Sequence, residues 1–476
     1  MNTGTPVDVL SLDPSAEEPL YRQIYERFRG AIAGGVLKPG DRIPSARALT
    51  QELGLARGTI ESAYSLLAAE GYIQARGQAG TIVTPGLKLR EPVPTPLPRA
   101  PAVAAQGFRP ESVLPFQMGL PALDAFPRKI WARLGARRAR AMQPIDMVHP
   151  PVHGLPQLRA QIASYLQVSR GIDCSASQVF VTSGYRHTIG LIAHALLKPG
   201  DRVWLEDPGY PPTRQLLAHM RITAVPVPVD GQGMVVADAI KAAPRARAAV
   251  VTPAHQSPLC MSLSLPRRLA LLDWAVRSDA WIVEDDYDGE YRYVSRPLPA
   301  LKSLDRDGRV LYAGTFSKVL FPGIRLAYLV VPLAQVGLFE EVSDVFAGGS
   351  PEFTQSMVAA FMEEGHFARH IQRMRKLYGE RREATVSGLE GVLGKYVRID
   401  SQPGGMHLVL RLQGRRSDRR LVARMREENL YAEALTDWTA DGDGPSALLL
   451  NFTNVDSRRT AEKLAGRILE LLLPSP

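Results

Sequence analysis

Apolar side chains at helical spacing open the chain and predict its first elements. They recur every four residues before a stop at Gly34-Gly35, and they are Leu20, Ile24, Phe28 and Ile32. A second helix is expected over 44–53, with a tight turn at Gly54, and a third over 57–71. Two short β-type runs around a glycine-containing turn, within 72–84, indicate a hairpin. Three helices followed by a hairpin predict a winged helix-turn-helix.

The chain from residue 116 onward alternates apolar runs with helical patterns. The runs occupy 179–182, 202–205, 248–252 and 280–283. Strands that alternate with helices predict an α/β layout around a mostly parallel sheet.

A proline-rich segment without apolar periodicity separates these two parts. It extends from Pro85 to Pro115 and is typical of a semi-extended linker. We therefore expect a small domain over 1–84, a linker over 85–115 and a large domain over 116–476.

Composition excludes several classes of protein. The chain has 476 residues, 45% hydrophobic and 22% charged, which is a normal balance for a protein with a large core. No apolar run is long enough to span a membrane, and the first residues lack the pattern of a signal peptide, so a cytoplasmic location without a membrane partner is expected. The two cysteines, Cys174 and Cys260, are too few for a disulfide framework or a cysteine-rich metal site, and no metal is expected.

Charge is distributed unevenly along the chain. The net charge is +9, yet residues 1–85 hold eight basic and nine acidic side chains, whereas 86–140 hold ten basic and three acidic. The basic stretch 128–140 could attract a polyanion or could be a solvated helix face, and the sequence leaves both open.

One lysine lies in a pattern that suits pyridoxal phosphate. Lys318 sits in the run Gly314-Thr315-Phe316-Ser317-Lys318, and Arg325 follows seven residues later. An amine among small hydroxyl donors, with an arginine nearby, offers a Schiff-base nitrogen and a place for a phosphate. Upstream, Asp285 ends an apolar strand, where its carboxylate could pair with a protonated pyridine nitrogen.

A second element could contribute to the same phosphate site. Ser183-Gly184-Tyr185 lies between a predicted strand and a predicted helix. Backbone N–H groups at the start of a helix bind phosphate well, so this turn is expected to join Thr315, Ser317 and Arg325.

The small domain carries candidate DNA contacts. In a winged helix-turn-helix the first residues of the third helix lie over base edges, which favours Arg57 and Thr59 as the readers of sequence. Ser45 and Arg47 at the start of the second helix, and Arg76 in the wing, are better placed for phosphates.

The phrases at 19–24, 37–47 and 57–60 resemble the DNA-binding domain of GntR-type repressors, and the match covers residues 18–84. This resemblance implies double-stranded DNA as a partner. Ala56 departs from the serine that the family usually has before the arginine, so a capping or phosphate contact is expected to be missing.

The large domain is similar to the fold-type I aminotransferases, which implies that transferase fold with a smaller C-terminal α/β subdomain. The fusion to a GntR-like head resembles the MocR/GabR-like subfamily of regulators. The phrases that carry the resemblance lie at 206–211, 252–256, 284–288 and 314–318.

The resemblance implies roles for individual residues. Lys318 would form the Schiff base, Asp285 would pair with the pyridine nitrogen, Tyr287 would bind the ring 3-oxygen and Tyr210 would stack on the ring. The phosphate would be held by Ser183, Gly184, Thr315, Ser317 and Arg325, with Tyr185 and His255 also in the cofactor site. Tyr210 could instead be a core aromatic, and His255 could belong to an ordinary loop pair.

Three departures bear on what the site accepts. Pro258-Leu259-Cys260 replaces the usual Pro-Thr-Gly. Met147-Val148-His149 lies in the segment where relatives place a tyrosine that reaches the partner subunit's phosphate, and the sequence leaves open whether His149 replaces that tyrosine. Leu449-Leu450-Asn451-Phe452 lacks the arginine that grips a substrate carboxylate in catalytic aminotransferases. An apolar side chain cannot make that bidentate contact.

Two hypotheses from different classes follow. In the first, the protein is a DNA-binding transcriptional regulator that senses pyridoxal phosphate or an amine effector at Lys318, as a homodimer on an operator with repeated half-sites. In the second, it is a working aminotransferase with a DNA-binding head. The head and the missing arginine favour regulation as the main role, although exchange at Lys318 needs no carboxylate grip.

Overall fold

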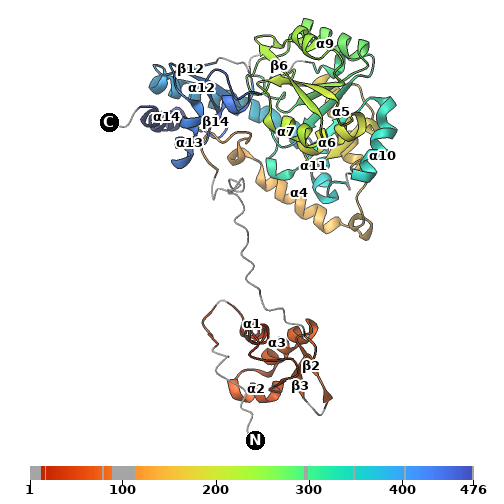
Figure 1. Cartoon of the computed structure of the whole chain (residues 1–476), viewed down its shortest axis with the longest axis vertical. Helices are drawn as coiled ribbons and strands as arrows, with labels where there is room; N and C mark the ends of the chain where they lie inside the picture. The colour runs from red at the N-terminus through yellow and green to blue at the C-terminus, as the bar shows by residue number, and fades with distance from the viewer. Residues whose placement is uncertain are drawn as a thin grey trace. The chain divides into compact units, whose positions relative to one another are not determined.

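A computed structural model describes residues 12–16, 18–77, 80–87, 113–293, 299–346, 349–400 and 404–473. The chain divides into two compact units, residues 1–109 and 110–476 (Figure 1). Most of the expected linker, residues 88–112, lies outside the described residues, so its boundaries stay a proposal.

The first unit has the predicted three helices. They are α1 (Leu20–Ala33), α2 (Ala46–Leu53) and α3 (Arg57–Ala69), and Gly54 closes α2 in the left-handed conformation. The predicted hairpin, β2 (Ile73–Ala75) and β3 (Thr81–Val83), gains a third strand, β1 (Arg42–Ile43), in the antiparallel order β1-β3-β2. The two-residue β1 is too short for its periodicity to be read from the sequence. The apolar faces of the helices meet in one core, as the helical spacing predicted.

The second unit is built on an eight-stranded sheet. Its strands in spatial order are β4 (Val179–Thr182), β11 (Ala327–Val330), β10 (Val310–Thr315), β9 (Trp281–Asp286), β8 (Ala248–Val251), β5 (Arg202–Asp207), β6 (Thr223–Asp230) and β7 (Gly233–Met234). Strands β10, β9, β8, β5 and β6 are parallel, whereas β11 and β7 run antiparallel to their neighbours. The prediction of a mostly parallel sheet is confirmed.

Helices cover both faces of this sheet. In β4, Val179 and Val181 belong to a core with α5 and α11, whereas Phe180 belongs to a core with α6 and α10. The helices of this part are α4 (Arg128–Ala141), α5 (Pro156–Arg170), α6 (Tyr185–Leu196), α7 (Pro211–His219), α8 (Val236–Ala242), α9 (Leu265–Arg277), α10 (Val336–Phe346) and α11 (Glu352–Glu363). Burial on both faces explains why the strands read as continuous apolar runs rather than alternating ones.

A smaller subdomain completes the second unit. Its antiparallel sheet has the order β12 (Val397–Ile399), β13 (His407–Leu412), β15 (Ala447–Asn451) and β14 (Glu433–Ala434). The long α12 (His366–Leu393), α13 (Asp418–Glu427) and α14 (Arg458–Leu472) pack with it around one core. Figure 1 shows these blue elements gathered beside the large sheet. Within the described residues no helix could cross a membrane.

Candidate functional site

The predicted site residues follow the carboxyl ends of strands in the large sheet. Ser183 follows β4, Tyr210 follows β5 and His255 follows β8. Asp285 and Tyr287 lie at the end of β9, and Lys318 follows β10. Because the carboxyl ends of parallel strands meet at one edge, residues more than a hundred positions apart in sequence converge here.

Lys318 presents its amine inside this edge. Its Nζ donates to the carbonyl oxygen of Gly119 at 2.9 Å. Gly119 has a positive φ, and a Cβ there would lie 2.5 Å from Nζ, so only glycine leaves room for the amine. Burial lowers the pKa of Lys318, and the nearby carboxylates of Asp288, Glu433 and Asp285 oppose that shift. A lysine with a lowered pKa is a better nucleophile, because more of it is uncharged near neutral pH.

Asp285 is a buried carboxylate that favours a cationic or N–H partner. Burial raises its pKa well above the ordinary value, and the charges of Asp286 and Glu206 add to that effect. The next residue, Asp286, is fixed by Arg170 Nε at 2.6 Å and by the Tyr312 hydroxyl at 2.6 Å. These two contacts fix the end of β9. The carboxylate of Asp285 lies in the site, where among the described residues mainly Lys318 offsets its negative charge.

Tyr287 carries an orphaned hydroxyl. Its oxygen is buried and has no hydrogen bond of good geometry within the described residues, although Ser257 lies beside it. Burial also raises the pKa of Tyr287 well above the ordinary value, so the hydroxyl keeps its proton. A buried, protonated donor without a partner suits a ligand that brings an acceptor oxygen.

The turn from β4 to α6 and the residue Arg325 form an anion cradle, defined by Ser183, Gly184 and Arg325. Gly184 caps α6 at φ 106°, a conformation that side chains disfavour, and a Cβ there would lie 3.6 Å from the Arg325 guanidinium. Arg325 is exposed and forms no ion pair within the part of the chain described. A helix start beside an unpaired cation suits a phosphate.

Three local features determine which groups of the cradle and of the turn before Lys318 can face a ligand. The segment before Arg325 contains the 3-10 turn η7 (Pro322–Ile324), and Arg325 follows it in the left-handed conformation. The N–H of Ser183 donates to His187 Nδ1 at 2.9 Å, so only the Ser183 hydroxyl, 3.1 Å from that of Ser350, can face a ligand. Thr315 accepts through its hydroxyl from the Ser317 N–H at 3.1 Å, which fixes the turn before Lys318.

Two tyrosines form a wall of the site. Tyr210 is 42% exposed, which rules out the alternative of a core aromatic. Its ring contacts Tyr185 edge-on, with centroids 5.5 Å apart, and Trp438 at 5.6 Å. Tyr185 and Tyr210 line a cavity of about 250 Å³ together with Asp285. An aromatic wall beside a buried carboxylate suits a flat heteroaromatic ring.

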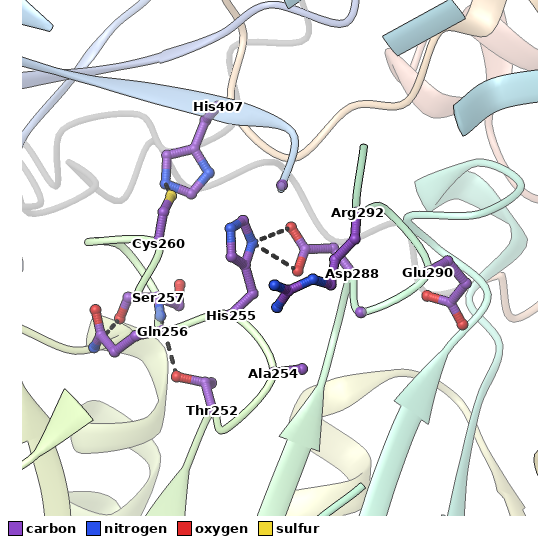
Figure 2. A network of polar contacts seen from close by, with 12 residues as sticks. Thr252, Ala254, His255, Gln256, Ser257, Cys260, Asp288, Glu290, Arg292 and His407 are labelled. Atoms are coloured by element: carbon purple, nitrogen blue, oxygen red, sulfur yellow. Dashed lines mark hydrogen bonds and ion pairs between the residues drawn. The ribbon is translucent and has the colours of Figure 1, made fainter. Parts of the chain in front are cut away.

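His255 belongs to a buried polar network (Figure 2). Its Nδ1 lies 3.2 Å from both carboxylate oxygens of Asp288, and its Nε2 is buried without a partner among the described residues. Gly405 packs on the ring, where a Cβ would lie 1.8 Å from Cε1. Asp288 lies within the phrase 284–288, but its role could not be predicted from the sequence, because its pairing with His255 exists only in three dimensions.

The segment Pro258-Leu259-Cys260, where this chain departs from the usual Pro-Thr-Gly, contacts His407 through Cys260 (Figure 2). Cys260 has a φ of 66°, and its Sγ lies 3.2 Å from His407 Nε2. That nitrogen also lies 2.8 Å from the carbonyl oxygen of Pro258, to which it can donate. Burial raises the pKa of the Cys260 thiol well above the ordinary value. The Cys260 thiol therefore favours its protonated form, and its contact with His407 helps to shape the loop.

At the position where catalytic aminotransferases have an arginine, this chain has the apolar Leu449, and the nearby Asn451 uses its side-chain amide to hold a neighbouring segment. Leu449 is fully buried. Asn451 donates from Nδ2 to the carbonyl oxygens of Gln117, at 2.9 Å, and Leu120, at 2.7 Å. It thereby holds the segment whose Gly119 receives Lys318, a function that sequence reasoning missed.

The first unit presents its candidate DNA contacts as follows. Arg57 begins α3, and its exposed side chain pairs with Glu61 at 2.7 Å. Arg47 and Arg76 are exposed, and Thr59 is half-buried. The Ser45 hydroxyl accepts from the Ala48 N–H at 3.1 Å, so it caps α2. Ala56 provides no side-chain cap for α3, as its departure from serine implied.

His149 is exposed. Its contact with a partner subunit's phosphate is not tested by a single chain and stays a prediction.

Glu206 is a site residue that sequence reasoning missed. It lines the same cavity as Asp285, and its Oε2 accepts from the Thr252 hydroxyl at 2.5 Å, the Thr252 N–H at 3.3 Å and Gln256 Nε2 at 3.4 Å. Burial raises the pKa of Glu206 from 4.5 to about 7. The carboxyl is therefore half-protonated near neutral pH.

We predict that Glu206→Gln stabilises the second unit at alkaline pH. As pH rises from 4.5 to about 7, the unfolded chain ionises at Glu206 before the folded chain does, so wild-type stability falls through this window. Glutamine keeps one oxygen for the three donors and cannot ionise. The variant should gain about 1–3 kcal/mol over wild type near pH 8 and little below pH 4.5. Urea unfolding followed by tryptophan fluorescence measures this, because all five tryptophans lie in the second unit.

The exposed Glu427→Gln on α13 is the control and should show no such pH-dependent gain. A gain for Glu206→Gln that is equal at both pH values would contradict the burial argument.

Comparisons with known proteins agree with this geometry. Residues 122–468 match the family described as "Aminotransferase class I and II", and residues 20–83 match "Bacterial regulatory proteins, gntR family". The probable rhizopine catabolism regulatory protein MocR of Rhizobium meliloti is 35% identical over 468 residues, which cover 95% of this chain and 94% of that protein. The pyridoxine biosynthesis transcriptional regulator PdxR of Corynebacterium glutamicum is 34% identical over 408 residues, covering 84% and 85%.

Solved aminotransferases share the fold of the second unit. LysN, the α-aminoadipate aminotransferase of Thermus thermophilus complexed with N-(5'-phosphopyridoxyl)-L-leucine, matches with a TM-score of 0.69 and 28% identity, over 76% of this chain and 92% of that one. The kynurenine aminotransferase of Pyrococcus horikoshii, in complex with PMP, matches with a TM-score of 0.68 and 26% identity, over 76% and 92%. The expected fold-type I domain and winged helix-turn-helix are confirmed. The chain belongs to the MocR-like subfamily of GntR regulators, in which a helix-turn-helix head is joined to an aminotransferase class I and II domain.

Proposed function

We propose that the protein is a pyridoxal phosphate-dependent DNA-binding transcriptional regulator. The observation that carries this proposal is the presence, in one chain, of an exposed recognition helix led by Arg57 and a buried amine at Lys318. The second unit senses the cofactor or an amine effector at Lys318, and the first unit contacts DNA.

Pyridoxal phosphate is the cofactor, as class I and II aminotransferase membership implies. When bound, it supplies an aldehyde carbon that condenses with a primary amine and a ring that accepts electrons. Several features of this chain fit it: the buried Tyr287 hydroxyl without a partner, the glycine at 184 beside Arg325, and the weakly compensated Asp285.

We propose a role for each of these residues in binding pyridoxal phosphate. Lys318 supplies the amine, whose pKa is lowered by burial. Asp285 holds a proton-bearing ring nitrogen, and Tyr287 donates to the ring oxygen. The anion cradle, with Thr315 and Ser317 shaping the turn, holds the phosphate, while Tyr210 and Tyr185 cover the ring and His255, oriented by Asp288, lies beside it.

The alternative is a working aminotransferase that carries a DNA-binding head. The similarity to solved aminotransferases and the complete set of Lys318, Asp285 and Tyr287 favour it. The buried, apolar Leu449 argues against it, because it cannot orient the carboxylate of an amino acid. Regulation is therefore the main function that we propose.

We propose that the regulator acts as a homodimer on an operator with repeated half-sites, in the cytoplasm. The segment before His149 supports a subunit interface, because Ile145 is 71% exposed and Met147 is 70% exposed. Exposed apolar side chains that lie close together in the chain are typical of an interaction surface. Two heads on a two-fold dimer would meet two half-sites.

For the cofactor site we predict that Arg325→Gln weakens binding of pyridoxal phosphate roughly tenfold to a hundredfold, because a charge-assisted contact to the phosphate is lost. Absorbance titration of the cofactor-free protein measures the affinity. Arg221→Gln is a matched control, since Arg221 is also an exposed arginine in the left-handed conformation. Equal affinities for the two variants would show that Arg325 does not hold the phosphate.

For the head we predict that Arg57→Ala weakens binding to the protein's own upstream DNA by roughly tenfold or more, since a base contact from the recognition helix is lost. Fluorescence anisotropy with labelled DNA measures this. Arg29→Ala is the control: Arg29 also pairs with a glutamate on its own helix, Glu26 at 3.0 Å, but lies on α1. The assignment of α3 as the reader is wrong if both substitutions have the same effect.

A further inference from the structure

The side of the site where β14 and β15 meet is apolar. We define the apolar wall by Leu259, Val409, Leu435, Trp438, Ala447 and Leu449, which form one buried cluster. Met118 packs against this wall, and the next residue, Gly119, receives the amine of Lys318. A ligand that binds near Lys318 beside Met118 therefore meets hydrocarbon.

One carboxylate interrupts this surface. Glu433 lies opposite Leu449 in the β14–β15 register. Its Oε1 accepts from the Tyr431 hydroxyl at 3.2 Å and its Oε2 from Trp438 Nε1 at 3.0 Å. Both donors are neutral, and a carboxylate has about four acceptor positions, so Glu433 can accept further hydrogen bonds. Trp438 also contacts Tyr210, which links Glu433 to the aromatic wall of the site.

Among the described residues, the charged groups that act most on the Lys318 amine are all acidic. The groups whose charge acts on its amine are Asp288, Glu433 and Asp285. Among the described arginines near the site, Arg325 belongs to the anion cradle and Arg214 lines the cavity of Tyr185 and Tyr210, a cavity that no residue of the apolar wall lines. Arg292 donates to Ser262 at 3.2 Å, and Arg426 is exposed and lies over the Tyr431 ring at 5.9 Å. A carboxylate or sulfonate that a ligand placed beside the apolar wall would thus face acids and hydrocarbon among the described residues. It would lose its hydration there without gaining a cationic partner.

We infer that the effector of this regulator is a primary amine that lacks a carboxylate or sulfonate and carries a second donor group, an ammonium or hydroxyl, bound by Glu433. The amine end lies at Lys318, the hydrocarbon of the ligand packs on the apolar wall, and the second donor reaches the Glu433 carboxylate. This inference rests on the proposed function, because it names what the sensing site accepts.

The test compares linear diamines, from 1,3-diaminopropane through 1,6-diaminohexane, with ω-amino acids of matched length. Each is titrated into the full-length, cofactor-loaded protein and followed by calorimetry and by visible absorbance. The best diamine should bind roughly tenfold or more tightly than its matched amino acid, since a charge-assisted contact to Glu433 replaces repulsion. Glu433→Gln should remove most of this preference, because the amide keeps the shape but not the charge. Glu427→Gln, an equal loss of charge at an exposed position of α13, should retain it.

Three outcomes would overturn the inference: an amino acid that binds as tightly as its matched diamine, no binding by any member of either series, or the same effect from Glu433→Gln and Glu427→Gln. Failure of the proposed function itself would look different. In that case the protein would lack the visible band of bound cofactor or would not bind its upstream DNA.

Discussion

The carboxyl end of β9 is the constraint on which the second unit depends. Asp285 is buried there, and burial raises its pKa well above the ordinary value. A buried carboxylate charge is unfavourable unless a cationic or hydrogen-bonding partner compensates it. The structure holds it in place through its neighbour, because Asp286 is anchored to the buried Arg170 and to Tyr312. Arg170 also contacts Glu290, at 3.1 Å, so one guanidinium fixes the residue after Asp285 and the far end of the segment that carries Tyr287 and Asp288. Tyr287, His255 and Lys318 are placed around that segment.

The two units of the chain obey different physical demands. The second unit buries charge and leaves polar groups unsatisfied, which is costly and marks a ligand site. The first unit does the opposite, with a small apolar core and exposed arginines on α2 and α3. A signal between them requires that the ligand bind one arrangement of the dimer more tightly than another. Lys318, held by the Gly119 carbonyl and by the Asn451-supported segment around it, is the position where ligand exchange can begin such a change.

Most of the fold and the centre of the site could be predicted from the sequence. Apolar runs located the strands because both faces of the sheet are buried, and the order of the phrases around Asp285 and Lys318 identified the cofactor chemistry. What could not be predicted depends on distant partners. Gly119 and Lys318 are far apart in sequence, β1 and β14 have two residues each, and the pKa of Glu206 follows from its burial. The pairing of His255 with Asp288 and of Cys260 with His407 likewise exists only once the loops have met.

We propose that Lys318 connects cofactor binding to DNA binding in one molecule. The most direct test is the affinity of the full-length protein for its upstream DNA, measured with and without pyridoxal phosphate, for wild type and for Lys318→Ala. We expect the cofactor to change the affinity of wild type but not that of Lys318→Ala, while both proteins still bind DNA. An affinity that does not respond to the cofactor in wild type, or responds equally in both proteins, would contradict this account.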